Sequence, residues 1–119
     1  MEQRPITDHK DLDAWKIARR LVRDVYVATR ALPEDERFGL TSQMRRAAVS
    51  IPCNIAEGYG RGAKQEYIRY LRIARGSAAE LGTQIMLCED LGYHLDSPAL
   101  NDHLARCRQL LNGLLRSLQ

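Results

Sequence analysis

The chain has 119 residues, enough for one domain with one hydrophobic core and too few for two ordinary domains. Its composition is that of a globular protein, with 45% hydrophobic and 28% charged residues. No apolar run approaches the ~20 residues that span a bilayer, so we expect no membrane partner. Basic residues outnumber acidic ones by 18 to 15, and the net charge of +3 permits nucleic-acid contact without requiring it.

The cysteines indicate a reducing compartment. The three, at positions 53, 88 and 107, form neither a Cys-x-x-Cys pair nor an even set of disulfides. The charged start of the chain has no signal-peptide core. We therefore predict a cytoplasmic protein, with residues 1–10 as a flexible N-terminal tail and residues 11–119 as a single domain.

Apolar residues recur at steps of three and four along the chain, which is typical of amphipathic helices. The first helix is expected to begin after a cap at Asp11 and to stop at Pro33, before an exposed acidic loop. A second is expected over about residues 41–57 and a third over 64–91, followed by a Gly-Tyr-His turn. The fourth is expected to open at Ser97 and Pro98.

Each helix carries an apolar stripe that we assign to the core. The stripes contain Ala14, Trp15, Ala18, Leu21, Val22, Val25, Ala28, Thr29, Leu32, Met44, Ala48, Ile51, Ile55, Tyr67, Leu71, Ala74, Ala78, Leu81, Ile85, Cys88, Leu100, Leu104, Cys107, Leu111, Leu114 and Leu118. Four such helices with short connections predict an all-α fold, an antiparallel up-and-down four-helix bundle. A three-helix bundle with a hairpin is the weaker alternative.

Pro52 lies inside the second apolar stripe, so the predicted helix should be kinked there. Proline removes the hydrogen bond to the Ala48 carbonyl and clashes with it, at a cost of about 3 kcal/mol if nothing compensates. The side chain of Ser50 or Asn54 is expected to bond near the freed carbonyl. Glycines 58, 60 and 62 are expected to supply the left-handed conformations that end this helix.

A phosphate cradle is the alternative interpretation of the Gly-Tyr-Gly-Arg-Gly stretch. Dinucleotide and P-loop sites need a strand before the glycines, whereas here a helix precedes and another follows, and no Gly-Lys-Ser/Thr occurs. A kink followed by a turn is the favoured interpretation. Arg61 and Lys64 at the turn are candidates for a phosphate contact.

Nothing in the pattern favours an enzyme, and we predict neither catalytic residues, nor a metal, nor a cofactor. No Glu is followed three residues later by His, the spacing of di-metal sites in bundles. Asp90 and His94 fit a surface pair or a cap better than a metal site. His103 is expected to be solvated, and Cys88 and Cys107 to act as small core hydrophobes.

The central stretch from Gln43 to Tyr93 carries a family resemblance. Its matching features are RRAAVSIPxNIAEGxGR, which contains Pro52, Asn54, Glu57, Gly58 and Gly60, then GSxxEL, TQ and LGY, with DLDAW at the start of the first helix. They resemble the bacterial four-helix-bundle family encoded in intervening sequences of 23S ribosomal RNA genes. The resemblance covers nearly the whole chain.

The resemblance implies a ring-shaped homo-oligomer with five subunits. Relatives include the accessory variability determinants of diversity-generating retroelements, basic pentamers that engage a reverse transcriptase and nucleic acid. The present chain is only mildly basic, which argues against equally strong binding. RNA, DNA or a reverse transcriptase are therefore the partners that the resemblance implies.

Two surfaces are candidates for binding. A polyanion-binding surface is predicted at Arg19, Arg20, Arg23, Arg61, Lys64, Arg69, Arg72 and Arg75, although salt bridges are the usual use of such charges. A subunit interface is predicted on the third helix, opposite its core stripe, at Arg72, Gly76, Ala79, Thr83 and Met86. Glycine in mid-helix costs about 1 kcal/mol relative to alanine, which favours a close neighbouring backbone over a plain solvent face.

The predicted function is a non-enzymatic oligomeric binding or scaffold protein, associated with RNA or with a nucleic-acid enzyme. The alternative is a protein-interaction ring with no nucleic-acid role. Glu57 and Glu80 are expected to pair with arginines such as Arg45 or Arg61 rather than to act as acid and base.

Overall fold

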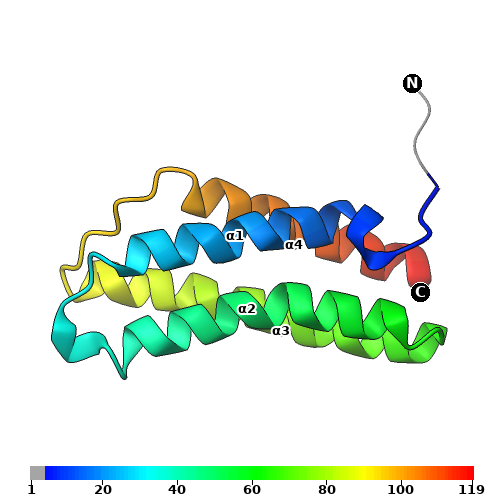
Figure 1. Cartoon of the computed structure of the whole chain (residues 1–119), viewed down its shortest axis with the longest axis horizontal. Helices are drawn as coiled ribbons and strands as arrows, with labels where there is room; N and C mark the ends of the chain where they lie inside the picture. The colour runs from blue at the N-terminus through cyan, green and yellow to red at the C-terminus, as the bar shows by residue number, and fades with distance from the viewer. Residues whose placement is uncertain (1–4) are drawn as a thin grey trace.

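The computed structural model describes residues 5–119 of the chain. Within those residues there is no strand, and the all-α fold is confirmed. The molecule extends over 44 × 31 × 19 Å, with the helices along its longest dimension (Figure 1). In chain order the elements are the 3-10 helix η1 (His9–Asp11), α1 (Asp13–Thr29), the 3-10 helix η2 (Glu34–Glu36), α2 (Leu40–Gly60), α3 (Lys64–Asp90) and α4 (Leu100–Leu118).

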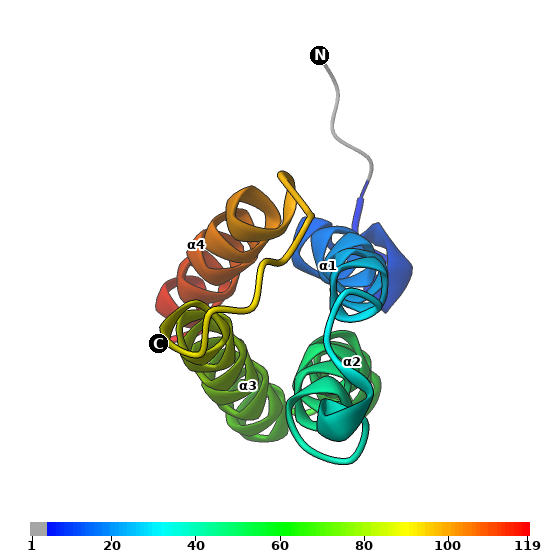
Figure 2. The same ribbon diagram turned by 90° about the vertical axis from the view of Figure 1, so that its left-hand side faces the viewer.

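The four helices pack as a bundle in which each helix has two neighbours. Helix α1 contacts α2 and α4, and α3 contacts the same two helices. No Cα atom of α1 lies within 8 Å of a Cα atom of α3, both helices being fully described, and the two occupy diagonal corners (Figure 2). Four α-helices in this arrangement rule out the three-helix alternative.

The predicted apolar stripes form most of the core. Side chains from all four helices are fully buried, including Leu21, Val25, Met44, Ile51, Ile55, Leu71, Leu81, Cys107 and Leu111. Trp15, Tyr67 and Leu114 are only partly buried, while Leu115 is 2% exposed. A straight helix with 3.6 residues per turn drifts from a seven-residue repeat. Near the end of α4 the buried position therefore moves from Leu114 to Leu115.

Both predicted helix starts at capping residues are wrong. The Asp11 carboxylate accepts hydrogen bonds from the Thr7 and Asp8 backbone N–H groups, at 3.0 and 3.1 Å, and α1 begins at Asp13 instead. The Ser97 carbonyl accepts from the N–H of Leu100 at 3.2 Å, and α4 begins at Leu100. In each case a residue suited to capping makes a local turn that competes with the helix.

The N-terminal stretch assigned to a tail is partly described. Residues 1–4 lie outside the described residues. Residues 9–11 form η1, capped by the Asp8 side chain, which accepts a hydrogen bond from the N–H of Lys10 at 2.9 Å. Leu12, just after η1, is 7% exposed, so the core begins there.

Helix α2 runs through Pro52 as one helix, which confirms a helix and not a strand at this position. The Asn54 side-chain amide donates to the Ser50 carbonyl at 2.8 Å and to the Ser50 hydroxyl at 2.9 Å. The carbonyl that proline leaves without its donor is that of Ala48. The Asn54 side chain therefore bonds a carbonyl two residues further along the helix, and not the freed one. The Ser50 hydroxyl also meets the Ser77 hydroxyl at 2.8 Å, which joins α2 to α3 beside the proline. The kink itself stays a prediction.

The glycines that follow Pro52 have different roles from those predicted. Of the three predicted turn glycines, Gly58, Gly60 and Gly62, only Gly62 has a positive φ, of 74°, and ends the helix as expected. Gly58 and Gly60 lie inside α2, so a left-handed role for them is wrong. A Cβ at Gly58 would lie 2.7 Å from the Cβ of Tyr70, closer than real Cβ contacts. Gly58 is therefore needed because α2 and α3 approach closely at this point.

The predicted turn after α3 is confirmed. Gly92 has a φ of 78°, and the Tyr93 N–H donates to the Cys88 carbonyl at 2.8 Å. Together with the bond from the Gly92 N–H to Glu89, this is the Schellman arrangement that satisfies the last carbonyls of a helix.

Candidate nucleic-acid interface

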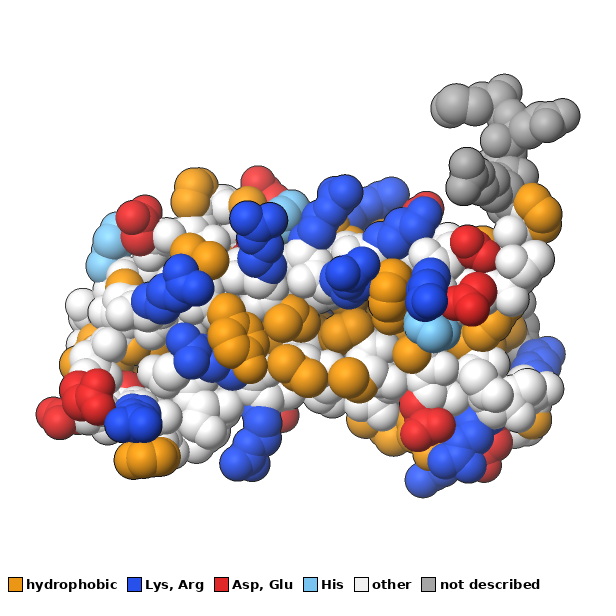
Figure 3. Space-filling view, viewed as in Figure 1, with side chains coloured by type: hydrophobic (Ala, Val, Ile, Leu, Met, Phe, Trp, Pro, Cys, Tyr) orange, Lys and Arg blue, Asp and Glu red, His pale blue; other side chains and the backbone are white. Residues whose placement is uncertain are grey.

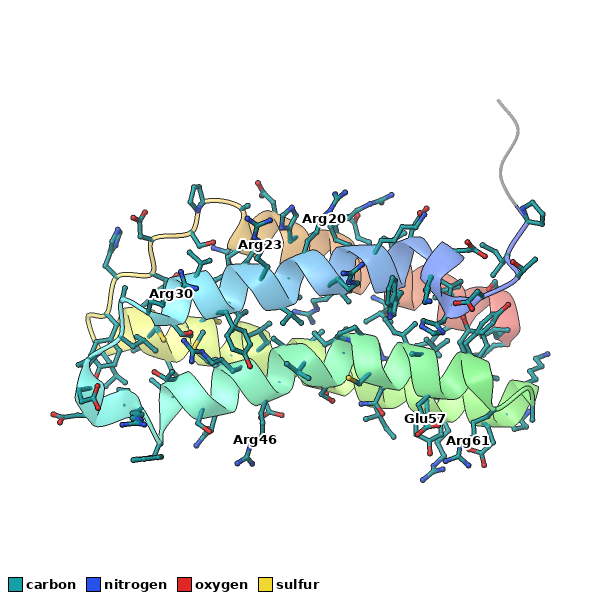
Figure 4. The ribbon with its side chains drawn as sticks, viewed as in Figure 1. Arg20, Arg23, Arg30, Arg46, Glu57 and Arg61 are labelled. Carbon is teal, nitrogen blue, oxygen red and sulfur yellow. The ribbon has the colours of Figure 1, made fainter. Side chains whose placement is uncertain are left out.

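Four cations follow one another along α1 and line an open hollow of about 400 Å³. They are Lys16, Arg19, Arg20 and Arg23, and all four side chains are exposed. We call these four residues the basic row. Basic side chains gather over α1 in Figure 3, and Arg20 and Arg23 project away from the bundle in Figure 4.

The basic row lacks carboxylate partners. None of its members forms a salt bridge with any residue in the described part of the chain. The Arg19 guanidinium lies 5.0 Å from the Trp15 ring centre, a cation–π contact that positions it without neutralising its charge. The row is therefore a patch of positive charge with no carboxylate of the described chain within salt-bridge distance.

Asp24, the acidic residue that directly follows the basic row in the sequence, contacts α4 and not the row. Asp24 is hydrogen-bonded to the Nδ1 atom of His103 on α4, and both side chains are partly buried. The expectation that His103 is solvated is wrong, because this pair joins α1 to α4. Since Asp24 is engaged across the bundle, it leaves the charge of Arg20 and Arg23 uncompensated.

Two of the predicted cations near the α2–α3 turn are paired. Arg61 meets Glu57 and Arg69 meets Glu66, each at 3.3 Å. Both guanidinium groups lie near the ring of Tyr70, at 5.3 and 5.2 Å from its centre. The predicted pairing of Glu57 with Arg61 is confirmed, and the two side chains lie together in Figure 4.

The remaining predicted cations lie on α3 and are exposed. Lys64 and Arg72 form no salt bridge with residues 5–119, and Arg75 donates to the Asn112 side chain at 3.5 Å. Because α1 and α3 are diagonal, the predicted polyanion-binding residues form two separate groups and not one surface.

The predicted interface residues on α3 share one exposed side of the helix. Arg72, Gly76, Ala79, Thr83 and Met86 are all exposed, with Met86 at 64%. We call them the α3 outer face. A Cβ at Gly76 would meet nothing within 4 Å, so the packing of the bundle does not require glycine here. Their role as an interface stays a prediction.

Arg45 has a structural role that the sequence did not reveal. Its Nε atom donates to the Thr29 hydroxyl at 2.9 Å, and its guanidinium lies 4.6 Å from the Tyr26 ring centre. The Thr29 hydroxyl in turn donates to the Val25 carbonyl at 2.7 Å and is buried with it. Arg45 therefore joins α1 to α2, and it pairs with neither Glu57 nor Glu80. The only indication of this contact in the sequence was a polar residue, Thr29, within an otherwise apolar stripe.

The buried thiols behave as core groups. Burial raises the pKa of the Cys107 thiol to about 12 and also raises the pKa of Cys88. Because the thiolate is the reactive form, both side chains stay protonated near neutral pH. The Cys88 sulfur lies 3.7 Å from the Met44 sulfur, inside the core.

Residues 5–119 contain neither a metal-binding group nor a membrane-spanning helix. No group of three or more His, Cys, Asp or Glu side chains within them is arranged to hold a metal ion. No helix among them has the length and apolar character needed to cross a membrane.

Comparison with known proteins identifies the family of the chain. The family model described as "23S rRNA-intervening sequence protein" matches residues 10–115, which is nearly the whole length. A search of curated proteins found no match. The match includes α1 with the basic row, the proline-containing α2, α3 and most of α4. The chain therefore belongs to the family of 23S rRNA-intervening sequence proteins.

Proposed function

We propose that this protein is a non-enzymatic scaffold that binds RNA through the basic row, on its own or together with a nucleic-acid enzyme. The observation that carries the proposal is the absence of carboxylate partners from four neighbouring cations on α1 within the described chain. Phosphate groups supply the missing negative charge, and arginine binds them with two parallel hydrogen bonds.

The scaffold is proposed to assemble from antiparallel up-and-down bundles into a ring. The α3 outer face supports this, since Met86 is exposed and Gly76 has free space beside it. A ring places one basic row per subunit around a common axis, so that several rows engage one polyanion. Five subunits is the number implied by the family resemblance, and the free cysteines support a cytoplasmic location.

Salt dependence gives the first test of RNA binding. If the basic row contacts about four phosphates, the logarithm of affinity should fall with the logarithm of salt concentration with a slope of about −3 to −4. Fluorescence anisotropy with a structured RNA and with single-stranded DNA, titrated with salt, measures this slope. An absence of detectable binding at low salt would refute the proposal.

A matched pair of variants locates the binding surface. Changing Arg19, Arg20 and Arg23 together to glutamine should weaken RNA binding more than about tenfold and make the slope shallower by about 2 to 3. Changing Lys64, Arg69 and Arg72 together to glutamine removes the same charge from α3 and should have a much smaller effect. Equal losses from the two triple variants would show that net charge, and not the basic row, governs binding.

A second candidate function, a protein-interaction ring without a nucleic-acid role, is favoured by the apolar exposure on α3. Ile73, Met86 and Leu87 are 41%, 64% and 44% exposed along this helix. An oligomer that binds no nucleic acid at low salt would support it over the first.

A further inference from the structure

An open groove crosses the start of α2, from α1 to the turn before α2, and exposes aromatic and basic side chains together. It has a volume of about 510 Å³ and is lined by Tyr26, Phe38, Val49, Arg37, Arg45 and Arg46, among others. We call these six residues the aromatic groove. In Figure 3, apolar side chains form a band between α1 and α2, with basic side chains beside it.

The groove contains two aromatic rings, each with an arginine against it. Phe38 is the only phenylalanine in the chain and is 86% exposed, the highest value among the exposed large hydrophobic residues. The Arg37 guanidinium lies 5.3 Å from the centre of its ring. Tyr26 is 39% exposed, and the Arg45 guanidinium lies 4.6 Å from its ring centre. The Phe38 ring is therefore a flat apolar surface that the described chain leaves open.

Aromatic rings beside arginines are the combination that binds unpaired nucleotides. Every base has a flat π face that can stack on an aromatic ring, while positive side chains hold the phosphates. The groove lining contains no acid, and Arg45 and Arg46 form no salt bridge with residues 5–119. The hydroxyl groups of Thr41 and Ser42 also line the groove, where they can hydrogen-bond to the edge of a base.

The aromatic groove continues the basic row along α1. Arg19, Arg23, Tyr26 and Arg30 recur at steps of four, three and four, the spacing of residues on one side of a helix. Arg30 directly follows α1 with helical backbone angles, is exposed, and has no salt bridge in the described chain. Arg23 and Arg30 lie along the same helix in Figure 4. Since Arg23 and Tyr26 are only about 5 Å apart along the helix axis, one RNA strand can contact the row and the groove together.

Three acidic residues in the preceding turn determine which part of a nucleotide can lie at Phe38. None of them lines the groove, and they are Glu34, Asp35 and Glu36. Glu34 pairs with Arg37 at 3.5 Å, and the Glu36 carboxylate accepts a hydrogen bond from the Tyr93 hydroxyl at 2.9 Å. Their negative charge disfavours a phosphate or an acidic peptide at this end of the groove, but it does not repel an uncharged base. A base therefore fits at Phe38, with the phosphates on the side of α1.

We infer that the aromatic groove binds an unpaired base of an RNA whose phosphates contact the basic row, with the base stacked on Phe38. Arg45 and Arg46 supply positive charge for the phosphates that flank this base. The RNA that is bound has a loop or a bulge, because the bases of a duplex are already stacked on one another. The inference rests on the proposed RNA binding and specifies the form of RNA that is recognised.

Substitutions at Phe38 test the stacking contact without disturbing the bundle. Phe38→Ala removes a ring that is 86% exposed, and Phe38→Tyr keeps a ring in its place. Met86→Ala on α3 is the matched control, because it shortens another apolar side chain, 64% exposed, outside the groove. Fluorescence anisotropy measures the binding of an RNA hairpin with an unpaired loop and of a fully paired RNA duplex with the same number of phosphates. Circular dichroism and light scattering monitor the fold and the mass of each variant.

The expected result is a selective loss of hairpin binding. Wild type should bind the hairpin more tightly than the duplex, and Phe38→Ala should weaken hairpin binding at least about fivefold. Duplex binding should be unchanged, and so should the salt slope for the hairpin, because no phosphate contact is removed. Phe38→Tyr and Met86→Ala should bind both RNAs as wild type does. The unchanged slope separates the loss of a stacked base from the loss of charge in the basic row.

The opposing outcomes separate the inference from the proposed function. If wild type binds RNA and Phe38→Ala binds the hairpin equally well, the inference is overturned and the basic row remains the binding surface. Equal losses for the hairpin and the duplex, accompanied by a lower mass, would assign Phe38 to a contact between proteins and overturn the inference as well. A wild type that binds neither RNA at low salt overturns the proposed function, and the inference with it.

Discussion

The arginines of α1 and those near the α2–α3 turn have the same chemistry but different surroundings. Arg20 and Arg23 have no carboxylate partner in the described chain, whereas Arg61 and Arg69 each meet a glutamate and lie near Tyr70. A guanidinium that already holds a carboxylate has less to gain from a phosphate. The comparison teaches that pairing, more than the number of cations, distinguishes a binding surface from a structural one.

The largest expected effect comes from adjacent arginines that differ in their contacts with α1. Arg45→Ala should lower the free energy of unfolding by about 2 kcal/mol, because the hydrogen bond to Thr29 and the contact with Tyr26 are lost. Arg46→Ala should change it by less than about 0.5 kcal/mol. Urea unfolding of both variants, compared with wild type, measures the two effects. Equal effects would contradict the structural role assigned to Arg45.

A smaller effect is expected from disturbing the paired region without changing its charge. Gly58→Ala places a Cβ 2.7 Å from the Cβ of Tyr70 and should lower the free energy of unfolding by about 1 kcal/mol through overpacking. Gly113→Ala has open space and should instead raise it by about 0.5 to 1 kcal/mol. Denaturant midpoints measure both, and a Gly58→Ala protein as stable as the control would show that α2 and α3 can separate freely.

The smallest expected effect comes from converting the paired region into an unpaired one. Changing Glu57 and Glu66 together to glutamine releases Arg61 and Arg69, so RNA affinity at low salt should rise by about two- to fivefold. Changing Asp96 and Asp102 together to asparagine gives the same net charge without freeing a paired arginine. If both variants gain equally in anisotropy titrations, the pairing has no influence.

The stripes that build the core could be predicted because helical periodicity is a local property. Ala18, Ile51 and Leu71 are buried as their spacing requires, whatever partner they meet. Helix ends were harder to predict, since Asp11 and Ser97 have local turns available that compete with capping.

The contacts between helices could not be predicted in the same way. Asp24 with His103, and Thr29 with Arg45, join residues from different helices, and nothing in their local sequence selects one partner over another. Gly58 looked like a turn residue because glycine favours turns, whereas the structure uses it for close packing. For the same reason, the arginines of α1 and α3 were grouped by sequence although the fold separates them.

The hydrogen bond between Tyr93 and Glu36 joins two loops at one end of the bundle, the α1–α2 loop and the α3–α4 loop. The Tyr93 hydroxyl donates to the Glu36 carboxylate at 2.9 Å, across 57 residues of sequence. The segment before α2 and the segment after α3 should therefore fray together, as one cooperative unit in native-state hydrogen exchange. Tyr93→Phe should make the amides of both segments exchange faster at once.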